Sequence, residues 1–163
     1  MTIGYSAFEL LEMAQQMERN GCAFYERAVA VTEGEAAATL QTLAEMERAH
    51  EETFAAMAAE LRGQERPDTA LDPNAEAVQY VRAVVGGHVF ELRADPAEWL
   101  GTRPTLASVL RTAIDLEKET ILYYLGVRDV LTGPDRDRMD EIIREEMGHV
   151  VLLTRRLPGE RGA

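Results

Sequence analysis

The chain has 163 residues, of which 46% are hydrophobic and 28% are charged. This composition is typical of a globular domain that builds its own core. Its 29 acidic side chains outnumber 17 basic ones and give a formal net charge of −12, which argues against binding to nucleic acid or to an anionic membrane surface. The single cysteine, Cys22, excludes an internal disulfide and metal knuckles built from paired cysteines.

The sequence also lacks the patterns of membrane and secreted proteins. It has no run of about 18 apolar residues that could form a membrane span. Its first residues, MTIGYSAFELLEM, do not show the basic segment and apolar core of a secretory signal. We therefore expect a cytoplasmic protein, in which any metal ion would be bound by oxygen and nitrogen ligands.

The first part of the chain predicts two long helices. Ser6 and Glu9 have the spacing of a capping box, and apolar residues then recur at helical intervals, which predicts a helix over about 6–32. Gly34 interrupts this pattern, and a second apolar stripe predicts a helix over about 35–62. Because the connection is so short, the two helices should lie antiparallel.

The segment 64–104 has a different character. It carries Pro67, Pro73, Pro96 and Pro104, four of the six prolines in the chain. Asp72-Pro73 and Asp95-Pro96 each resemble a helix N-cap followed by proline, which predicts short helices near 73–85 and 96–100. We interpret the segment as a crossover outside the core, with His88 at its surface.

Two further long helices follow the crossover. Thr105 is the predicted cap of a helix over about 105–131, and Gly133-Pro134 separates it from a helix over about 135–157. Two helical hairpins joined by one long connection predict an all-α fold, a four-helix bundle in a single domain.

The two hairpins carry an internal repeat with an offset of 99 residues. The repeated residues have the same type and the same spacing in both halves. They are Glu18, Tyr25, Glu47 and His50 in the first half, and Glu117, Tyr124, Glu146 and His149 in the second.

These repeated residues suggest a metal site. Glu47 and His50 are three residues apart, as are Glu146 and His149, so each pair projects from one helix face. Glutamates that point into a bundle core are costly unless they are paired, protonated or bound to metal. Two divalent cations would balance four carboxylates, and the mixed oxygen and nitrogen ligands suit iron or manganese. The alternative, solvated glutamates and paired histidines, fits poorly with their place on the apolar stripes.

The order Glu, Glu-x-x-His, Glu, Glu-x-x-His resembles the rubrerythrin branch of the ferritin-like superfamily. The resemblance covers about 6–62 and 105–157 and leaves the crossover out. It implies a ferritin-like four-helix bundle with two iron ions, or manganese in their place. In this family Glu47 and Glu146 would bridge the ions, and Glu18 and Glu117 would be terminal ligands. The resemblance also implies that Tyr25 and Tyr124 hydrogen-bond to site carboxylates.

Some residues depart from the family pattern or are open to two interpretations. Thr120 stands where typical rubrerythrins have a further glutamate, and the four-cysteine rubredoxin domain is absent. Glu145 could orient His50 as a neighbour of the ligands or could be an exposed glutamate. Cys22 lies near the predicted site, where a small core residue is favoured over a redox thiol.

The leading functional hypothesis is an oxidoreductase whose diferrous site reacts with hydrogen peroxide or dioxygen. Peroxide turnover would then need an external electron donor, and we expect a homodimer or a larger homo-oligomer. One alternative is a ferroxidase or iron-storage protein. Another is a metal-binding bundle without catalytic activity.

Overall fold

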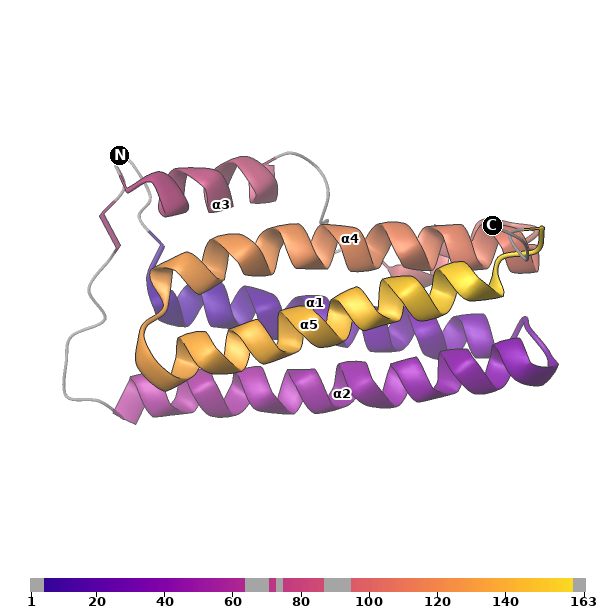
Figure 1. Cartoon of the computed structure of the whole chain (residues 1–163), viewed down its shortest axis with the longest axis horizontal. Coiled ribbons are helices and arrows are strands. Elements are labelled where there is room, and N and C mark those ends of the chain that lie inside the picture. The colour runs from indigo at the N-terminus through magenta and orange to yellow at the C-terminus, as the bar shows by residue number, and fades with distance from the viewer. Residues whose placement is uncertain (1–4, 64–70, 73–74, 87–94, 160–163) are drawn as a thin grey trace.

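The computed structural model describes residues 5–63, 71–72, 75–86 and 95–159. This part of the chain contains helices and no strands, so the predicted all-α class is confirmed. Five α-helices and one short 3-10 helix follow one another along the chain (Figure 1). They are α1 (Ala7–Val29), α2 (Gly34–Gly63), α3 (Glu76–Gly86), η1 (Pro96–Leu100), α4 (Leu106–Val130) and α5 (Gly133–Arg156).

Local hydrogen bonds explain where α1 begins and ends. Its capping box is formed, since the Glu9 amide donates to Ser6 Oγ at 3.1 Å and the Ser6 amide donates to Glu9 Oε2 at 2.8 Å. The helix ends at Val29, short of the predicted 32. The Thr32 hydroxyl instead donates to the Ala28 carbonyl at 2.9 Å and satisfies an acceptor of the last turn. The chain then reverses at Gly34, whose φ of 63° favours glycine.

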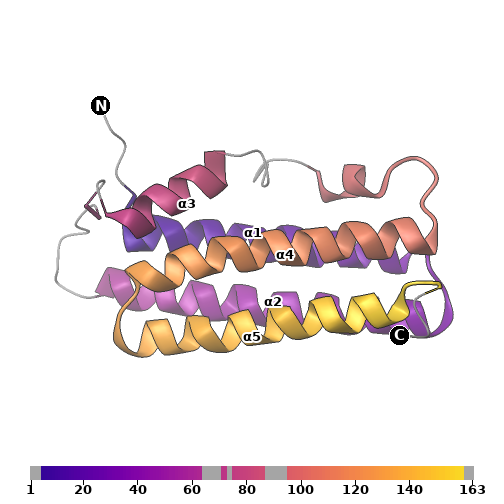
Figure 2. The ribbon, with the colours of Figure 1, turned by 45° about the horizontal axis from the view of Figure 1, so that its top comes forward.

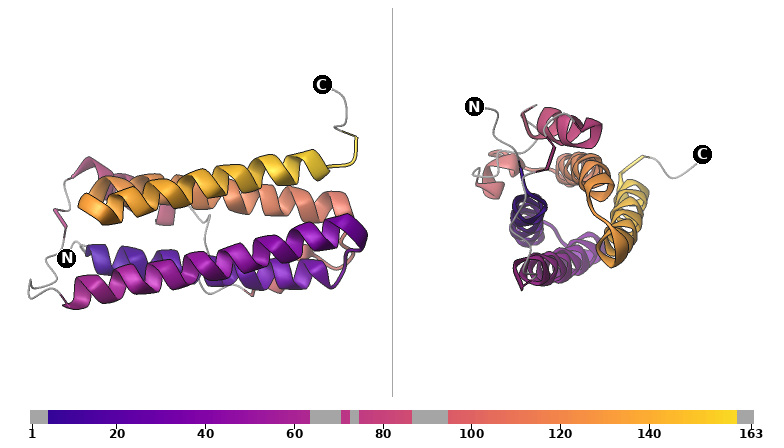
Figure 3. Two further views of the ribbon diagram at one scale, coloured as in Figure 1. Left: turned by 60° about the horizontal axis from the view of Figure 1, so that its bottom comes forward. Right: turned by 90° about the vertical axis from the view of Figure 1, so that its left-hand side faces the viewer.

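The four long helices form a bundle of two hairpins. Helix α1 packs along α2, and α4 packs along α5. The hairpins meet through contacts of α1 with α4 and of α2 with α5. The end-on view in Figure 3 shows the four helices around a common axis, with α3 outside them. Each long helix therefore presents one side to the centre of the bundle.

The core consists of two separate apolar clusters. They lie at opposite ends of the bundle. The first lies where α1 begins and α2 ends, and the second lies where α1 ends and α2 begins. The largest residues of the first are Leu10, Leu11, Phe54, Met57, Tyr123, Tyr124 and Met139, and those of the second are Phe24, Tyr25, Leu40, Leu43, Leu110 and Leu153. The middle of the bundle lies between these clusters.

The crossover elements cover one side of the bundle. Helix α3 packs on α4, and η1 contacts both α1 and α4. Figure 2 shows both elements on the same side of the bundle. The first short helix begins at Glu76 rather than near 73. Pro73 and His88 lie outside the described residues, so the predicted cap and the surface position of His88 stay predictions. The second short element, η1, covers the predicted range 96–100.

Gly126 allows α3 to approach α4 closely. A Cβ atom at this position would lie 2.6 Å from Tyr80 Cδ1 and 2.7 Å from Val81 Cγ2. The Tyr80 hydroxyl also donates to the Leu122 carbonyl of α4 at 2.9 Å. No larger residue fits at position 126 unless α3 moves away.

Within the described ranges, no helix is long and apolar enough to cross a membrane.

The contact of α3 with Gly126 can be tested with a pair of glycine variants. We expect Gly126→Ala to lower the free energy of unfolding by about 1–3 kcal/mol, because the added methyl group collides with α3. Gly148→Ala on α5 is the matched control, since a Cβ there meets nothing within 4 Å. It should raise stability by about 0.5–1 kcal/mol. Urea unfolding of the metal-free protein measures both changes. An equal gain in stability in the two variants would contradict the packing of α3 on α4.

Candidate metal centre

The structure brings all six predicted metal ligands together at the middle of the bundle, between the two apolar clusters. Each long helix contributes at least one of them. All are buried, with no residue more than 4% exposed. They are Glu18 on α1, Glu47 and His50 on α2, Glu117 on α4, and Glu146 and His149 on α5.

The six side chains form two overlapping groups that could each hold a metal ion. In each group, four ligand atoms lie within 4.8 Å of one another. Glu47 and Glu146 belong to both groups. The first group also contains Glu18 and His50, and the second contains Glu117 and His149. The two shared carboxylates are thus in the position that bridging ligands would need.

Glu146 lies between the two imidazoles. His50 Nδ1 is 2.8 Å from Glu146 Oε1, and His149 Nδ1 is 2.9 Å from Glu146 Oε2. Burial alone would raise the pKa of Glu146, but His149 and His50 together hold it well below its usual range. Burial alone would lower the pKa of His50, but Glu146 and Glu18 raise it to about 11. Without metal, the imidazoles therefore balance part of the buried negative charge.

The repeated tyrosines tie the two hairpins together at this site. The Tyr25 hydroxyl of α1 donates to Glu117 Oε1 of α4. In the mirrored arrangement, the Tyr124 hydroxyl of α4 donates to Glu18 Oε1 of α1. Burial and the nearby carboxylates raise the pKa of both tyrosines well above its ordinary value, so both remain donors. Each tyrosine thus orients the carboxylate of the opposite hairpin.

The two histidines differ in their outer contacts. His50 Nε2 lies 2.7 Å from Glu145 Oε2, although the Glu145 side chain is 52% exposed. Glu145 is therefore an exposed glutamate that also contacts His50, so both interpretations of this residue apply. His149 Nε2 has no hydrogen-bond partner within the described part of the chain. The position of Met46 corresponds to Glu145 in the repeat, and methionine cannot supply the same bond.

Several buried atoms of the cluster lack a hydrogen-bond partner among the described residues. They include Glu18 Oε2, Glu47 Oε1, both carboxylate oxygens of Glu146, and Nδ1 of both histidines. Glu146 and the two imidazoles thus lie at ion-pair distance without forming a hydrogen bond. Burial and the neighbouring carboxylates raise the pKa of Glu47 well above its ordinary value and that of Glu117 to about 8. Buried polar atoms without partners are rare in proteins. The oxygen and nitrogen donors converge as ligands of iron or manganese would.

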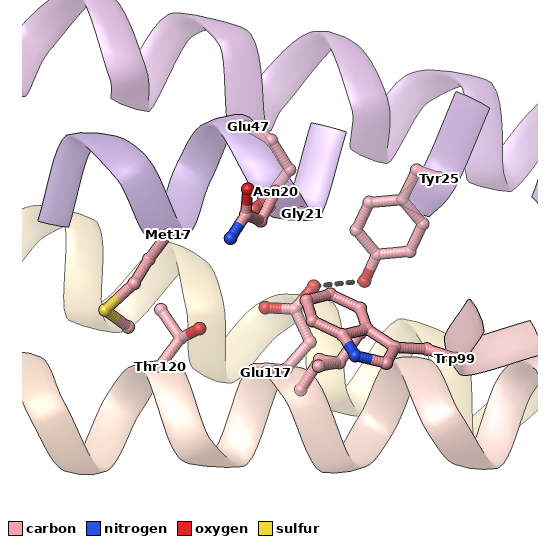
Figure 4. A pocket seen from close by; sticks show the side chains of 9 residues that line it. Met17, Asn20, Gly21, Tyr25, Glu47, Trp99, Glu117 and Thr120 are labelled. Carbon is pink, nitrogen blue, oxygen red and sulfur yellow. Dashed lines mark hydrogen bonds between the residues drawn. The ribbon is translucent and has the colours of Figure 1, made fainter. Parts of the chain in front are cut away.

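A small cavity adjoins the cluster on the side of α1 and α4 (Figure 4). Sequence reasoning missed its walls, among them Gly21 and Trp99. A Cβ at Gly21 would lie 2.5 Å from Glu47 Oε2, so only glycine leaves this carboxylate its position. The repeat pairs Gly21 with Thr120, and this mismatch was the one sign in the sequence that position 21 needs a glycine. Trp99 lies in the crossover, where no repeat could have pointed to it.

Cys22 is a buried core residue, as favoured from the sequence. It is 7% exposed and packs in the second apolar cluster. Its Sγ atom lies 3.5 Å from an Arg48 guanidinium nitrogen. Burial and Glu26 raise the pKa of its thiol, which disfavours the reactive thiolate form.

A bundle of two helical hairpins with four carboxylates and two imidazoles buried between them defines a ferritin-like di-iron carboxylate protein. The rubrerythrin family model matches residues 9–157, and the chain therefore belongs to the rubrerythrin family. The structure is similar to the crystal structure of a Thermotoga maritima protein described as ferritin-like and diiron-carboxylate. The TM-score is 0.72 at 28% identity, over 95% of this chain and 96% of the other. The comparison with curated proteins found no match.

The charge balance of the cluster can be tested in the metal-free protein. We expect Glu47→Gln to raise the free energy of unfolding by about 1–3 kcal/mol near pH 7. Burial and the neighbouring carboxylates raise the pKa of Glu47 in the folded protein, so folding has to protonate a carboxyl that is ionised in the unfolded chain, whereas glutamine needs no proton. Glu52→Gln, at an exposed position of the same helix, should change stability by less than about 0.5 kcal/mol. Urea unfolding with a chelator present measures both. A loss of stability in Glu47→Gln would contradict the electrostatic account.

Proposed function

We propose that the protein binds two iron ions in the buried cluster and reduces hydrogen peroxide. The observation that carries this proposal is the pair of overlapping ligand groups, which share Glu47 and Glu146. The buried atoms without hydrogen-bond partners support it, because a metal ion would satisfy them. Membership of the rubrerythrin family supports it further.

The two groups supply the ligands of the two positions. Glu18 and His50 would complete the first position, Glu117 and His149 the second, and the shared carboxylates would bridge them. When bound, two ferrous ions supply one electron each, so that hydrogen peroxide and two protons become two water molecules. An external donor would then return two electrons, because a chain with one cysteine cannot build a four-cysteine iron site.

The other residues of the chain prepare the site for this reaction. Tyr25 and Tyr124 hold the two terminal carboxylates. Glu145 orients His50 from the side remote from the cluster. The apolar clusters at both ends exclude bulk water and strengthen the electrostatic interactions inside. The protein thus supplies fixed ligands in a dry environment, and the metal supplies the electrons.

The first experiment is an anaerobic iron titration followed by one equivalent of hydrogen peroxide. We expect two irons per chain and a rapid ferric absorption band. Glu47→Ala should lose most of the bound iron and the band, since Glu47 belongs to both groups. Glu52→Ala, exposed on the same helix, is the control and should behave like the wild type.

Repeating the experiment with dioxygen in place of hydrogen peroxide separates the alternatives. A protein that is oxidised rapidly by dioxygen and slowly by peroxide would be a ferroxidase, and the peroxidase proposal would then be wrong. A protein that binds no iron in its folded state would contradict both the peroxidase and the ferroxidase function.

The role of the tyrosines can be tested with two neighbouring residues on α4. We expect Tyr124→Phe to weaken iron binding about 10-fold, because Glu18 loses the donor that orients it. The Tyr123 hydroxyl donates to the Leu10 carbonyl at 2.8 Å and does not contact the cluster. Tyr123→Phe should therefore lower stability by about 1 kcal/mol and leave the iron affinity unchanged. Equal effects of the two substitutions on affinity would contradict a specific role of Tyr124.

A further inference from the structure

The cavity beside the cluster lies between α1 and α4 and has a volume of about 20 Å³. Figure 4 shows the hydrogen bond from the Tyr25 hydroxyl to the carboxylate of Glu117, and both residues line the cavity. The Trp99 side chain of η1 lies next to them. The remaining walls come from α1, α4 and α2, namely Met17, Asn20, Gly21, Leu116, Thr120 and Glu47. The cavity therefore connects the crossover with the carboxylates of the site.

The cavity lies closer to one of the two proposed metal positions. Glu47 and Glu117 line it. Glu47 belongs to both ligand groups, whereas Glu117 belongs only to the group completed by His149. Neither Glu18 nor His50 is among its lining residues. His50 is also covered from outside by Glu145, at 2.7 Å from its Nε2 atom. A small molecule that enters here would meet the Glu117 side of the cluster.

The size and walls of the cavity restrict what can enter it. Its volume is enough for a molecule of about the size of water. The ring of Trp99 lines the cavity and stands 6.4 Å from the ring of Phe24, measured between centroids. Thr120 and Asn20 contribute side chains that can hydrogen-bond, whereas Met17 and Leu116 are apolar. These walls suit a small oxidant that carries both polar and apolar character.

We propose that this cavity admits the oxidant to the Glu117 side of the cluster and that Trp99 limits its size. The substrate class is then hydrogen peroxide or dioxygen, and organic hydroperoxides are excluded. This inference rests on the proposed function and adds to it the route and the size limit. It assigns a specificity role to η1, in a crossover whose described residues belong to neither ligand group.

The test compares hydrogen peroxide with tert-butyl hydroperoxide as oxidants of the iron-loaded protein. We expect the wild type to react about 100-fold faster with hydrogen peroxide, and Trp99→Ala to gain about 10-fold with the bulky oxidant while its rate with hydrogen peroxide changes little. Glu98→Ala, at the exposed neighbouring position of η1, is the control and should keep the wild-type ratio. A wild type that reacts equally with both oxidants, or a Trp99→Ala variant with the wild-type ratio, would overturn the inference.

Failure of this inference differs from failure of the proposed function. If neither oxidant reacts with the loaded protein, the peroxidase proposal is wrong. If both react at equal rates, that proposal stands and only the size limit is wrong.

A second measurement does not depend on activity. In a crystal of the metal-free protein under xenon, an atom of similar size to dioxygen, we expect xenon between Met17 and Trp99. Xenon bound beside His50 and not in this cavity would overturn the inference.

Discussion

Four carboxylates and two imidazoles buried at the centre of one bundle are the constraint on which the structure depends. Such a cluster opposes folding, because each carboxylate loses its hydration and faces other carboxylates, which the imidazoles balance only in part. The two apolar clusters stabilise the fold on either side of it. Glu146 between the imidazoles and the tyrosines across the hairpins fix the geometry. The site therefore keeps its arrangement at the expense of stability, as functional sites commonly do.

The sequence predicted the bundle and the cluster because both follow from helical periodicity. Residues three and seven positions apart share one face of a helix, so Glu47 and His50 had to project together. The repeat placed Glu117 and Tyr124 on the second hairpin as the counterparts of Glu18 and Tyr25. Sequence reasoning of this kind identifies which residues meet along one helix and, through the repeat, which face one another across the bundle.

Other features depend on contacts between distant segments and have no periodic signal. The position of α3 depends on the absence of a side chain at Gly126, and the cavity depends on the packing of η1 against α1. A glycine within a helix, such as Gly126, or a tryptophan in a proline-rich crossover, such as Trp99, can have many structural roles, so the sequence alone does not identify the contact. The end of α1 was also misplaced, because the hydrogen bond of Thr32 to the Ala28 carbonyl competes with a further helical turn.

The unequal support of the two histidines has a consequence for the proposed iron centre. A carboxylate bound to the outer nitrogen of a ligand imidazole strengthens it as a ligand. Glu145 lies 2.7 Å from His50 Nε2, whereas His149 Nε2 has no hydrogen-bond partner among the described residues. The two positions should thus differ in affinity and fill in order, with the His50 position first. A chain that holds one ion can supply only one electron and cannot complete a two-electron reduction. Activity would then rise steeply with cellular iron supply, above the concentration that fills the weaker position.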